Sequence, residues 1–336
     1  MAEQGLPLVS VMITTRNRLV LLPRALQSVY AQGYPSLEIL VLDDASQDGT
    51  SDYIRSHHPD IRLFRFEQNR GLIAARNHLM SEAKGDYIVS LDDDAFFLDA
   101  DTISRVVARM EAEPEVAVVG FCMVQREEDA EQAPEPEHYT SDYWGCGHCI
   151  RKAALRETGY YREIALQQSE ESVLSLRVLD KGYRLVYFPP ATIVHAFYLA
   201  SDRDWGRIRA LTARNRLLLA WLDEPFPWYI LTTAHALVIY SARAAWKGNL
   251  RDVLRGFCEA FKDFPRLKST RRPVSSRAMR IYFALSQGKI RDGSAIRSLY
   301  RNPPGVFRIL FRRWTGRPSR FATGRSSEAN RPTIRG

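Results

Sequence analysis

The 336-residue sequence predicts an α/β fold, in which a mostly parallel sheet is flanked by helices and a helical, basic extension follows. Three observations predict it. β-Branched apolar runs alternate with segments of helical periodicity, polar clusters follow the runs, and the charge of the chain divides near residue 200. Such alternation is typical of a parallel sheet covered on both faces, where ligands bind beyond the carboxyl ends of the strands.

The predicted elements alternate from the start of the chain. They are a strand at 8–15, a helix at 19–32, a strand at 37–42, a helix at 50–57, a strand at 61–66, a helix at 72–84 and a strand at 87–91. Apolar β-branched runs predict the strands, and apolar residues three or four apart predict the helices. Segment 125–142, rich in Glu, Pro and Gln, predicts an exposed loop. Beyond Asp202 the pattern is helical, with no further strand.

The charge of the chain is unevenly distributed. Residues 1–200 contain 19 Lys and Arg and 30 Asp and Glu, a net charge of 19 − 30 = −11, whereas residues 201–336 contain 28 and 9, a net charge of 28 − 9 = +19. The two parts are therefore expected to meet different partners. We predict a ligand-binding domain over 1–200, a helical basic region over 201–316 and a disordered tail over 317–336.

The cysteine content and the N-terminal residues indicate the cellular compartment of the protein. Four cysteines make no disulfide framework, and the first 15 residues lack a basic stretch followed by an apolar core, so we expect a cytoplasmic protein. His235 and Arg243 interrupt the longest apolar run, 228–245, which makes it a poor transmembrane helix. Cys146 and Cys149 lack the second pair or the thioredoxin-like setting that a zinc or redox site needs.

Three consecutive aspartates, Asp92, Asp93 and Asp94, follow the last predicted strand. Their mutual repulsion is costly unless a cation neutralises it, and oxygen ligands favour Mg²⁺ or Mn²⁺. A diphosphate would complete the coordination of such an ion. The alternative is a solvated acidic loop that caps the next helix.

Two further clusters follow strands at the same predicted edge. Asp43 and Asp44 can accept hydrogen bonds from a base or ribose, while Ser46, Asp48 and Thr50 form a turn and cap the next helix. Arg76 can reach a phosphate or a base, unless it is an ordinary surface arginine.

These motifs together resemble the family 2 glycosyltransferases, an inverting family with the GT-A fold. The matching segments are SVMITTRNR at 10–18, ILVLDDASQDGT at 39–50, NRGLIAARN at 69–77, GDYIVSLDDD at 85–94 and an acidic pair before LSLR. The resemblance implies a GT-A, Rossmann-like fold over about the first 200 residues. It also implies that Thr15, Arg16, Asp43, Asp44 and Arg76 surround the nucleoside. By the same resemblance Asp92 and Asp94 end an Asp-x-Asp element, with Asp94 the direct metal ligand, Asp92 nearer the ribose and metal, and Asp93 the variable middle.

The later segments concern the acceptor side. Gly145 and Gly147 would let backbone approach a sugar or acceptor, and Trp144 offers a flat face to a pyranose, although it can equally be a core residue. The resemblance implies that Glu171 is the general base, with Glu170 as the other candidate because Val173 stands where many relatives have an acid. It further implies that His195 approaches the metal or diphosphate; the alternative is a structural histidine.

The expected activity is transfer of a sugar from a nucleoside diphosphate sugar to a hydroxyl of a saccharide or lipid-linked acceptor, in cell-envelope polysaccharide or glycolipid synthesis. Stretches 214–222, 228–246 and 306–314 mix apolar faces with arginines, so an anionic membrane surface is an expected partner; packing helices are the alternative. No nucleic-acid-binding motif is found. A nucleotidyltransferase would show a glycine-rich phosphate loop, which TTRNR is not, and an inactive sugar-nucleotide-binding protein is the second alternative.

Overall fold

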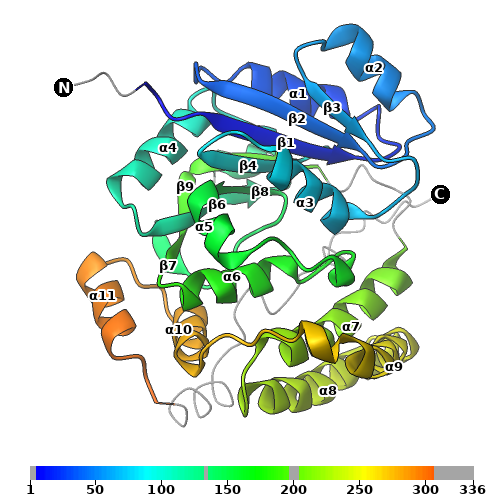
Figure 1. Cartoon of the computed structure of the whole chain (residues 1–336), viewed down its shortest axis with the longest axis vertical. Helices are drawn as coiled ribbons and strands as arrows, with labels where there is room; N and C mark the ends of the chain where they lie inside the picture. Colours follow the sequence, from blue (N-terminus) through cyan, green and yellow to red (C-terminus); the bar gives the residue numbers. More distant parts are fainter. Residues whose placement is uncertain (1–4, 132–134, 197–203, 306–336) are drawn as a thin grey trace.

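The computed structural model describes residues 5–131, 135–196 and 204–305. These residues form one nine-stranded sheet with helices packed against it, and a further group of helices below the sheet in Figure 1. The predicted tail over 317–336 and the basic stretch 306–314 lie outside the described residues.

The sheet is mixed, with its parallel part at the beginning of the chain. Its strands are β1 (Val9–Thr15), β2 (Leu37–Asp43), β3 (Arg62–Arg65), β4 (Tyr87–Asp92), β5 (Ala95–Phe97), β6 (Val116–Val124), β7 (His138–Thr140), β8 (Gly147–Arg151) and β9 (Arg184–His195). The order is β3-β2-β1-β4-β8-β6-β9-β5, and β7 also pairs with β9. The first four strands are parallel to one another, and β6 is parallel to β9, whereas β8 runs antiparallel between β4 and β6. The predicted α/β class is confirmed.

The helices of this first region pack on the sheet. They are α1 (Leu22–Tyr30), α2 (Thr50–His57), α3 (Leu72–Glu82), α4 (Thr102–Ala112), α5 (Lys152–Thr158) and α6 (Glu170–Asp180), with short 3-10 turns η1 (Glu127–Glu131) and η2 (Glu163–Ala165). α1 begins at Leu22, three residues later than predicted, with Pro23 in its first turn, where no backbone N–H is needed. Its buried residues repeat at helical spacing, so one stripe faces the core.

The end of the predicted loop over 125–142 is not a loop. His138, Tyr139 and Thr140 form β7, which pairs antiparallel with β9, and all three are buried. Three residues are too short a run for alternation to predict a strand, and the long-range pairing with β9 determines this one.

Within the described residues, five α-helices follow Asp204. They are α7 (Trp205–Asp223), α8 (Trp228–Trp246), α9 (Leu250–Leu267), α10 (Ser276–Gln287) and α11 (Gly293–Arg301). α7, α8 and α9 share a small apolar core that includes Leu217, Ala236 and Phe257. A second cluster packs Trp228 and Met279 against Leu176 of α6, so these helices dock on the sheet region through α6. In the described part of the chain, each helix is too short or too polar to cross a bilayer.

Candidate active site

The register of the parallel strands brings the predicted polar clusters to one edge. Thr15, the last residue of β1, pairs with Asp43 at the end of β2, and Thr14 pairs with Asp92 at the end of β4. Residues 28 and 78 positions apart in sequence therefore lie in one row, because neighbouring parallel strands end together.

His195 is brought to the acidic triplet by the other half of the sheet. β5 follows the triplet and pairs antiparallel with the end of β9, so that Ala95 lies opposite His195. The Ala196 N–H donates to the carbonyl of Asp94 at 2.8 Å, and the Asp92 N–H donates to the carbonyl of Cys146 at 3.3 Å. His195 is the last residue of β9.

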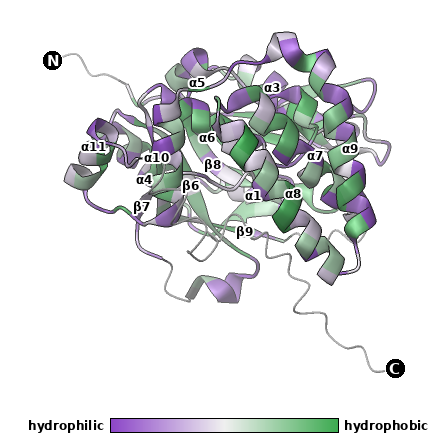
Figure 2. Cartoon of the chain, turned by 90° about the horizontal axis from the view of Figure 1, so that it is seen from below, coloured by the Kyte–Doolittle hydropathy of each residue, from purple (hydrophilic) through white to green (hydrophobic). Residues whose placement is uncertain are grey.

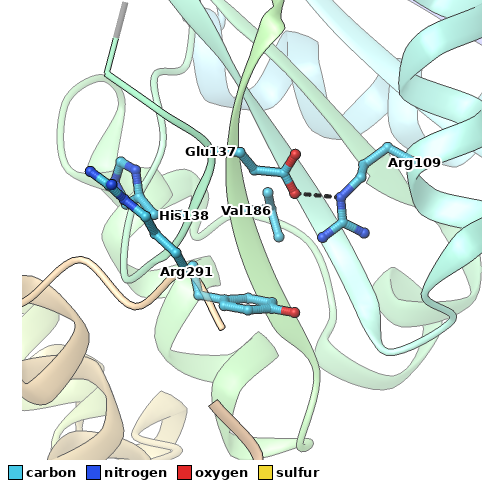
Figure 3. A pocket seen from close by; sticks show the side chains of 6 residues that line it. Arg109, Glu137, His138, Val186 and Arg291 are labelled. Carbon is cyan, nitrogen blue, oxygen red and sulfur yellow. Dashed lines mark hydrogen bonds and ion pairs between the residues drawn. The ribbon is translucent and has the colours of Figure 1, made fainter. Parts of the chain in front are cut away.

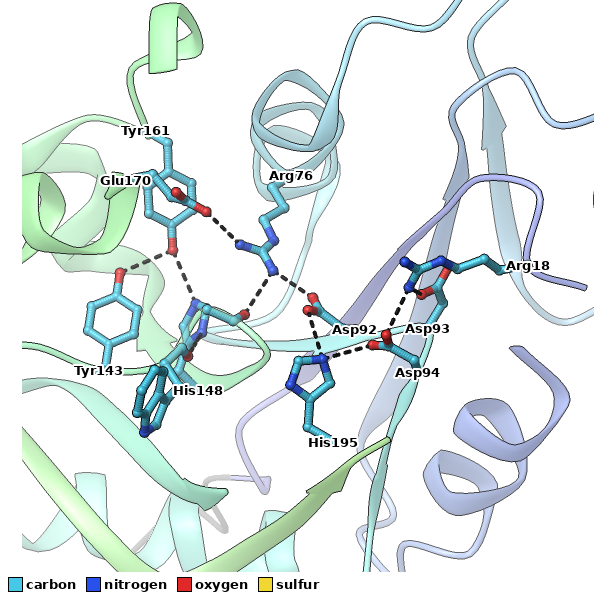
Figure 4. A network of polar contacts seen from close by, with 12 residues as sticks. Arg18, Arg76, Asp92, Asp93, Asp94, Tyr143, His148, Tyr161, Glu170 and His195 are labelled. Carbon is cyan, nitrogen blue, oxygen red and sulfur yellow. Dashed lines mark hydrogen bonds and ion pairs between the residues drawn. The ribbon is translucent and has the colours of Figure 1, made fainter. Parts of the chain in front are cut away.

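Asp92, Asp94 and His195 form a compact group of potential metal ligands. One ligand atom from each lies within 4.8 Å of the other two, and His195 Nε2 is 3.0 Å from Asp94 Oδ1 and 4.0 Å from Asp92 Oδ2 (Figure 4). Burial lowers the pKa of His195, but the Cys146 sulfur and the Asp94 carboxylate outweigh burial and raise it to about 11. The local field thus favours positive charge, and two carboxylate oxygens with one imidazole suit Mn²⁺ or Mg²⁺.

Asp93 and Arg18 lie beside this group. Arg18 Nη1 is 2.9 Å from both Asp93 Oδ1 and Asp94 Oδ2, so one guanidinium bridges two of the three aspartates (Figure 4). Burial raises the pKa of Asp93 to about 7 despite this contact. Arg18 belongs to the TTRNR segment, but sequence reasoning selected Arg16, which is exposed.

Arg76 connects the metal-ligand group to the acidic pair. Its Nη2 is 2.6 Å from Asp92 Oδ1 and donates to the Gly145 carbonyl at 2.9 Å, while its Nη1 is 3.1 Å from Glu170 Oε1. Burial disfavours the charge, but Asp92 and Glu170 outweigh it and raise the pKa of Arg76, so the side chain remains a cation. Only 2% of it is exposed, which excludes the alternative of an ordinary surface arginine.

Glu170 and Glu171 start helix α6, and their environments differ. Glu170 is buried and held by Arg76, whereas Glu171 lies against Gly145, where an added Cβ would be 2.1 Å from Glu171 Oε1. Burial, and next the charge of Glu170, raise the pKa of Glu171 well above that of an ordinary carboxyl group. A carboxylate with a raised pKa is a good proton acceptor, so Glu171 is the better candidate for a base.

The segment before α6 is held by the C-terminal helices. Leu166, Gln168 and Ser169 have φ values of 59°, 74° and 68°, a conformation that non-glycine residues adopt only under constraint. Asn215 of α7 is fully buried, and its Nδ2 is within 2.9 Å of the carbonyls of Ala165, Gln167 and Gln168. Sequence reasoning missed Asn215, because an asparagine inside a helix 44 residues after Glu171 carries no local signal.

Trp144, Gly145 and Gly147 have three different environments. Trp144 is 37% exposed, which leaves a face for a sugar ring. The lack of a side chain at Gly145 makes room for Glu171 and Arg76. Gly147 lies in β8, and a Cβ there would be 2.2 Å from Ile193 Cδ1, so this glycine permits core packing. Its predicted approach to a sugar or acceptor stays a prediction.

Asp43 and Asp44 organise the loops at the ends of β2 and β3. Asp43 accepts hydrogen bonds from the Ser46 N–H at 2.7 Å and from the side chains of Ser51 and Arg65. Asp44 accepts the backbone N–H groups of Arg70 and Gly71 at 2.8 and 2.9 Å. These bonds position the loops beside Thr15, which is buried at the end of β1.

A buried aromatic network, also missed from the sequence, lies behind Gly145. Tyr161 Oη is 3.2 Å from His148 Nε2 and 3.0 Å from Tyr143 Oη (Figure 4). Burial, and then the charge of Arg76, lower the pKa of His148 to about 3, so this imidazole is neutral.

Elsewhere, a small pocket is lined by Arg109, Glu137, His138, Tyr139, Val186 and Arg291, and it includes none of the predicted site residues (Figure 3).

Comparison with known proteins gives matches of three kinds. The profile described as Glycosyl transferase family 2 matches residues 10–167. EpsE of Bacillus subtilis, named as a glycosyltransferase, is 30% identical over 192 residues, which are 53% of this chain and 69% of EpsE. The GalNAc(5)-diNAcBac-PP-undecaprenol beta-1,3-glucosyltransferase of Campylobacter jejuni is 30% identical over 126 residues, 36% of this chain and 40% of that protein.

Among solved structures, the mannosyltransferase PcManGT from Pyrobaculum calidifontis, in complex with GDP-Man and Mn²⁺, has a similar fold. Its TM-score is 0.56 at 23% identity, over 77% of this chain and 88% of that one. At this identity the likeness concerns the arrangement of the sheet and helices.

Proposed function

Because the chain belongs to the family 2 glycosyltransferases, we propose that it transfers a sugar from a nucleoside diphosphate sugar to an acceptor hydroxyl, with inversion at the anomeric carbon and with a divalent cation. One observation carries the proposal. Asp92 is within 4.8 Å of the other two potential metal ligands and pairs with Arg76, which in turn pairs with Glu170. Arg76 thus links the potential metal ligands to the acidic pair at the start of α6, which includes the proposed base Glu171.

The residues fit a resident Mn²⁺ or Mg²⁺. Asp92, Asp94 and His195 would hold it, and their field already favours positive charge at His195. The Mn²⁺ in the PcManGT complex supports the choice of ion. Bound there, a divalent ion would act as a Lewis acid that neutralises the diphosphate leaving group. Arg18, beside Asp93 and Asp94, would add a second positive charge next to the same phosphates.

Glu171 is the proposed general base. It would accept the proton of the acceptor hydroxyl while that oxygen attacks the anomeric carbon on the face opposite the leaving group. A single displacement inverts the configuration, through a transition state with oxocarbenium character. Arg76 holds Glu170 as its ion-pair partner, so we assign Glu170 to positioning.

The nucleoside is proposed to lie over the ends of β1 and β2. Thr15, Arg16, Asp43, Asp44 and Asp93 would surround it. Arg76 would support this pocket from below through Asp92, because the guanidinium is buried. We propose residues 1–200 as the catalytic domain and 201–316 as a separate helical region, since every described strand ends before Ala196.

A lipid-linked saccharide is the proposed acceptor, in cell-envelope polysaccharide or glycolipid synthesis at the inner face of the membrane. Two observations support this proposal. The name of the Campylobacter jejuni relative includes a PP-undecaprenol-linked saccharide, and the region after residue 200 of this chain is strongly basic. Trp144, partly exposed beside Gly145, would stack on the acceptor sugar.

The test measures nucleotide release and sugar transfer from a panel of nucleoside diphosphate sugars, with Mn²⁺, with Mg²⁺ and after chelation. We expect transfer from one class of donor and its loss on chelation. Release of pyrophosphate would indicate a nucleotidyltransferase instead. Donor binding without turnover, in the presence of lipid-linked and free saccharide acceptors, would indicate a binding protein.

A further inference from the structure

The outer surfaces of α8 and α9 carry exposed apolar side chains. In α8, Ile230 and Val238 are 47% and 66% exposed, and Ala234 and Ala242 continue this stripe at steps of four residues. In α9, Leu254 and Phe261 are exposed, with Cys258 between them. Figure 1 places the two helices side by side at the lower edge of the molecule, and in Figure 2, seen from below, apolar α8 faces the viewer.

Basic side chains flank the apolar stripe of α9. Arg251, Arg255, Lys262 and Arg266 are exposed, and their spacing of four, seven and four residues places them on one side of the helix, next to the stripe. Two of the three acids of α9 turn away from this side, and the third, Glu259, is half-buried. Asp252 lies 2.8 Å from Arg209 and Asp263 lies 2.6 Å from Arg214, both on α7.

The exposed charges of this surface have one sign. From residue 225 to 291, within the described residues, each exposed charged side chain is a lysine or arginine. Ion pairs with α7 neutralise the inner side of α9, so the excess positive charge lies outside. Apolar residues beside a basic row are the pattern of a helix that lies in the headgroup region of an anionic bilayer.

We propose that the outer face of α8 and α9 docks on an anionic lipid surface, with Val238 and Phe261 in the headgroup layer and the α9 basic row on the phosphates. The apolar stripe favours lipid over nucleic acid, whose backbone offers charge but no apolar layer. This inference deepens the proposed function, because it names the face that would bring the active site to a lipid-linked acceptor. Vesicle binding, however, needs neither donor nor transfer, so it can fail or succeed independently of catalysis.

The experiment measures binding of the full-length chain to phosphatidylcholine vesicles with and without 30% phosphatidylglycerol by flotation. Residues 306–336 stay unchanged in all variants, so their contribution is common. We expect binding to the anionic vesicles only, weakened by 0.5 M salt. The triple variant R251E/K262E/R266E should bind more than tenfold more weakly, given the contribution of each basic residue near such a surface. V238S/F261S should also lose binding severalfold.

Matched controls change other exposed residues, away from this face. K84E/R156E/K181E alters the net charge by the same amount, and L6S/V20S removes two exposed apolar side chains; both should bind like the unchanged chain. Unfolding midpoints within about 2 °C of the unchanged chain establish that each variant is folded.

Several results would overturn the proposal. These are equal binding to neutral and anionic vesicles, or an equal loss in R251E/K262E/R266E and its control. Binding of duplex DNA that the α9 triple variant abolishes, with vesicle binding intact, would assign the face to nucleic acid. A dimer in sedimentation that V238S/F261S converts to monomer would assign it to a second copy of the chain.

Discussion

The sheet region and the helical region use their charges in opposite ways. In the sheet region, acidic side chains such as Asp94 and Glu170 are buried around a few arginines. In the helical region Asp252 and Asp263 of α9 pair inward with α7, and most exposed charges are lysines and arginines. Buried acids create an electronegative site that can hold a cation or exchange a proton, whereas exposed bases create a surface. Under the proposals above, the sheet region would carry the catalytic chemistry and the helical region would dock the chain.

The two regions nevertheless meet at the base of the site. Arg162, just before η2, lies 2.5 Å from the buried Asp223 at the end of α7. Asn215 binds the carbonyls of the segment that leads into Glu170 and Glu171. Ser172, the next residue, donates to Asp142 at 2.6 Å, and Asp142 is also 3.5 Å from Tyr282 of α10. The following predictions test how far the separation holds.

The largest effect is expected from Asp94→Ala. It removes one ligand of the proposed cation and the partner of both His195 and Arg18. We expect sugar transfer to fall by a factor of about 10³ or more, which corresponds to about 4 kcal/mol of transition-state stabilisation. Mn²⁺ titration should show weakened metal binding. Asp52→Ala, at an exposed site on α2, serves as the control and should keep full activity.

Glu171→Gln should reduce kcat by about 10²- to 10⁴-fold while the KM for the donor changes little, because a proton acceptor acts only in the chemical step. Steady-state kinetics at saturating Mn²⁺ measure both constants. Glu128→Gln makes the same substitution at an exposed position and serves as the matched control. An unchanged kcat in the Glu171 variant would show that another group is the general base.

Asn215→Ala tests whether the helical region positions the base. Three carbonyls lose their donor, so we expect a loss of about 1–3 kcal/mol in the free energy of unfolding and a fall in kcat of about tenfold, with the donor KM retained. Chemical denaturation and steady-state kinetics measure these effects. Asn302→Ala, at an exposed position, is the control. A change in stability alone would mean that α7 supports the fold but not the catalytic step.

Glu170→Gln should shift the pH dependence of transfer. A base works when deprotonated, so activity falls as the pH drops through the pKa of Glu171. The charge of Glu170 raises this pKa, and removing it also frees Arg76, which lowers the pKa; both effects have the same sign. The acidic limb of the kcat profile should therefore move to lower pH. A shift to higher pH would contradict the assignment of roles within the pair.

The smallest effect concerns stability. Burial raises the pKa of Asp142 to about 6, above its ordinary value of 3.8, so the folded state holds this proton more tightly than the unfolded state. Stability from this group is present below about pH 4 and is lost as the pH rises through about 6. Asp142→Asn should remove that loss and raise the free energy of unfolding at pH 8 by at most about 3 kcal/mol. Unfolding curves at pH 4, 6 and 8 provide the measurement.

Local pattern was sufficient for the first half of the sheet. The runs before Asp43 and Asp92 are continuously apolar, as expected of strands buried on both faces, and parallel neighbours end at one edge. That reasoning placed the acidic triplet, Asp43 and Thr15 in one row, and the structure confirms the row. Their roles in binding remain predictions.

The sequence alone is therefore enough to predict the order of the elements, the edge where the acids gather and the basic excess of the C-terminal region. The packing of distant segments adds that His195 faces Asp94, that Arg18 contacts the triplet, that Gly147 packs in the core and that Asn215 holds the segment before Glu170. The reason is that sequence patterns are local. Periodicity reports a residue's own strand or helix, whereas these contacts depend on pairing and packing between segments far apart in the chain.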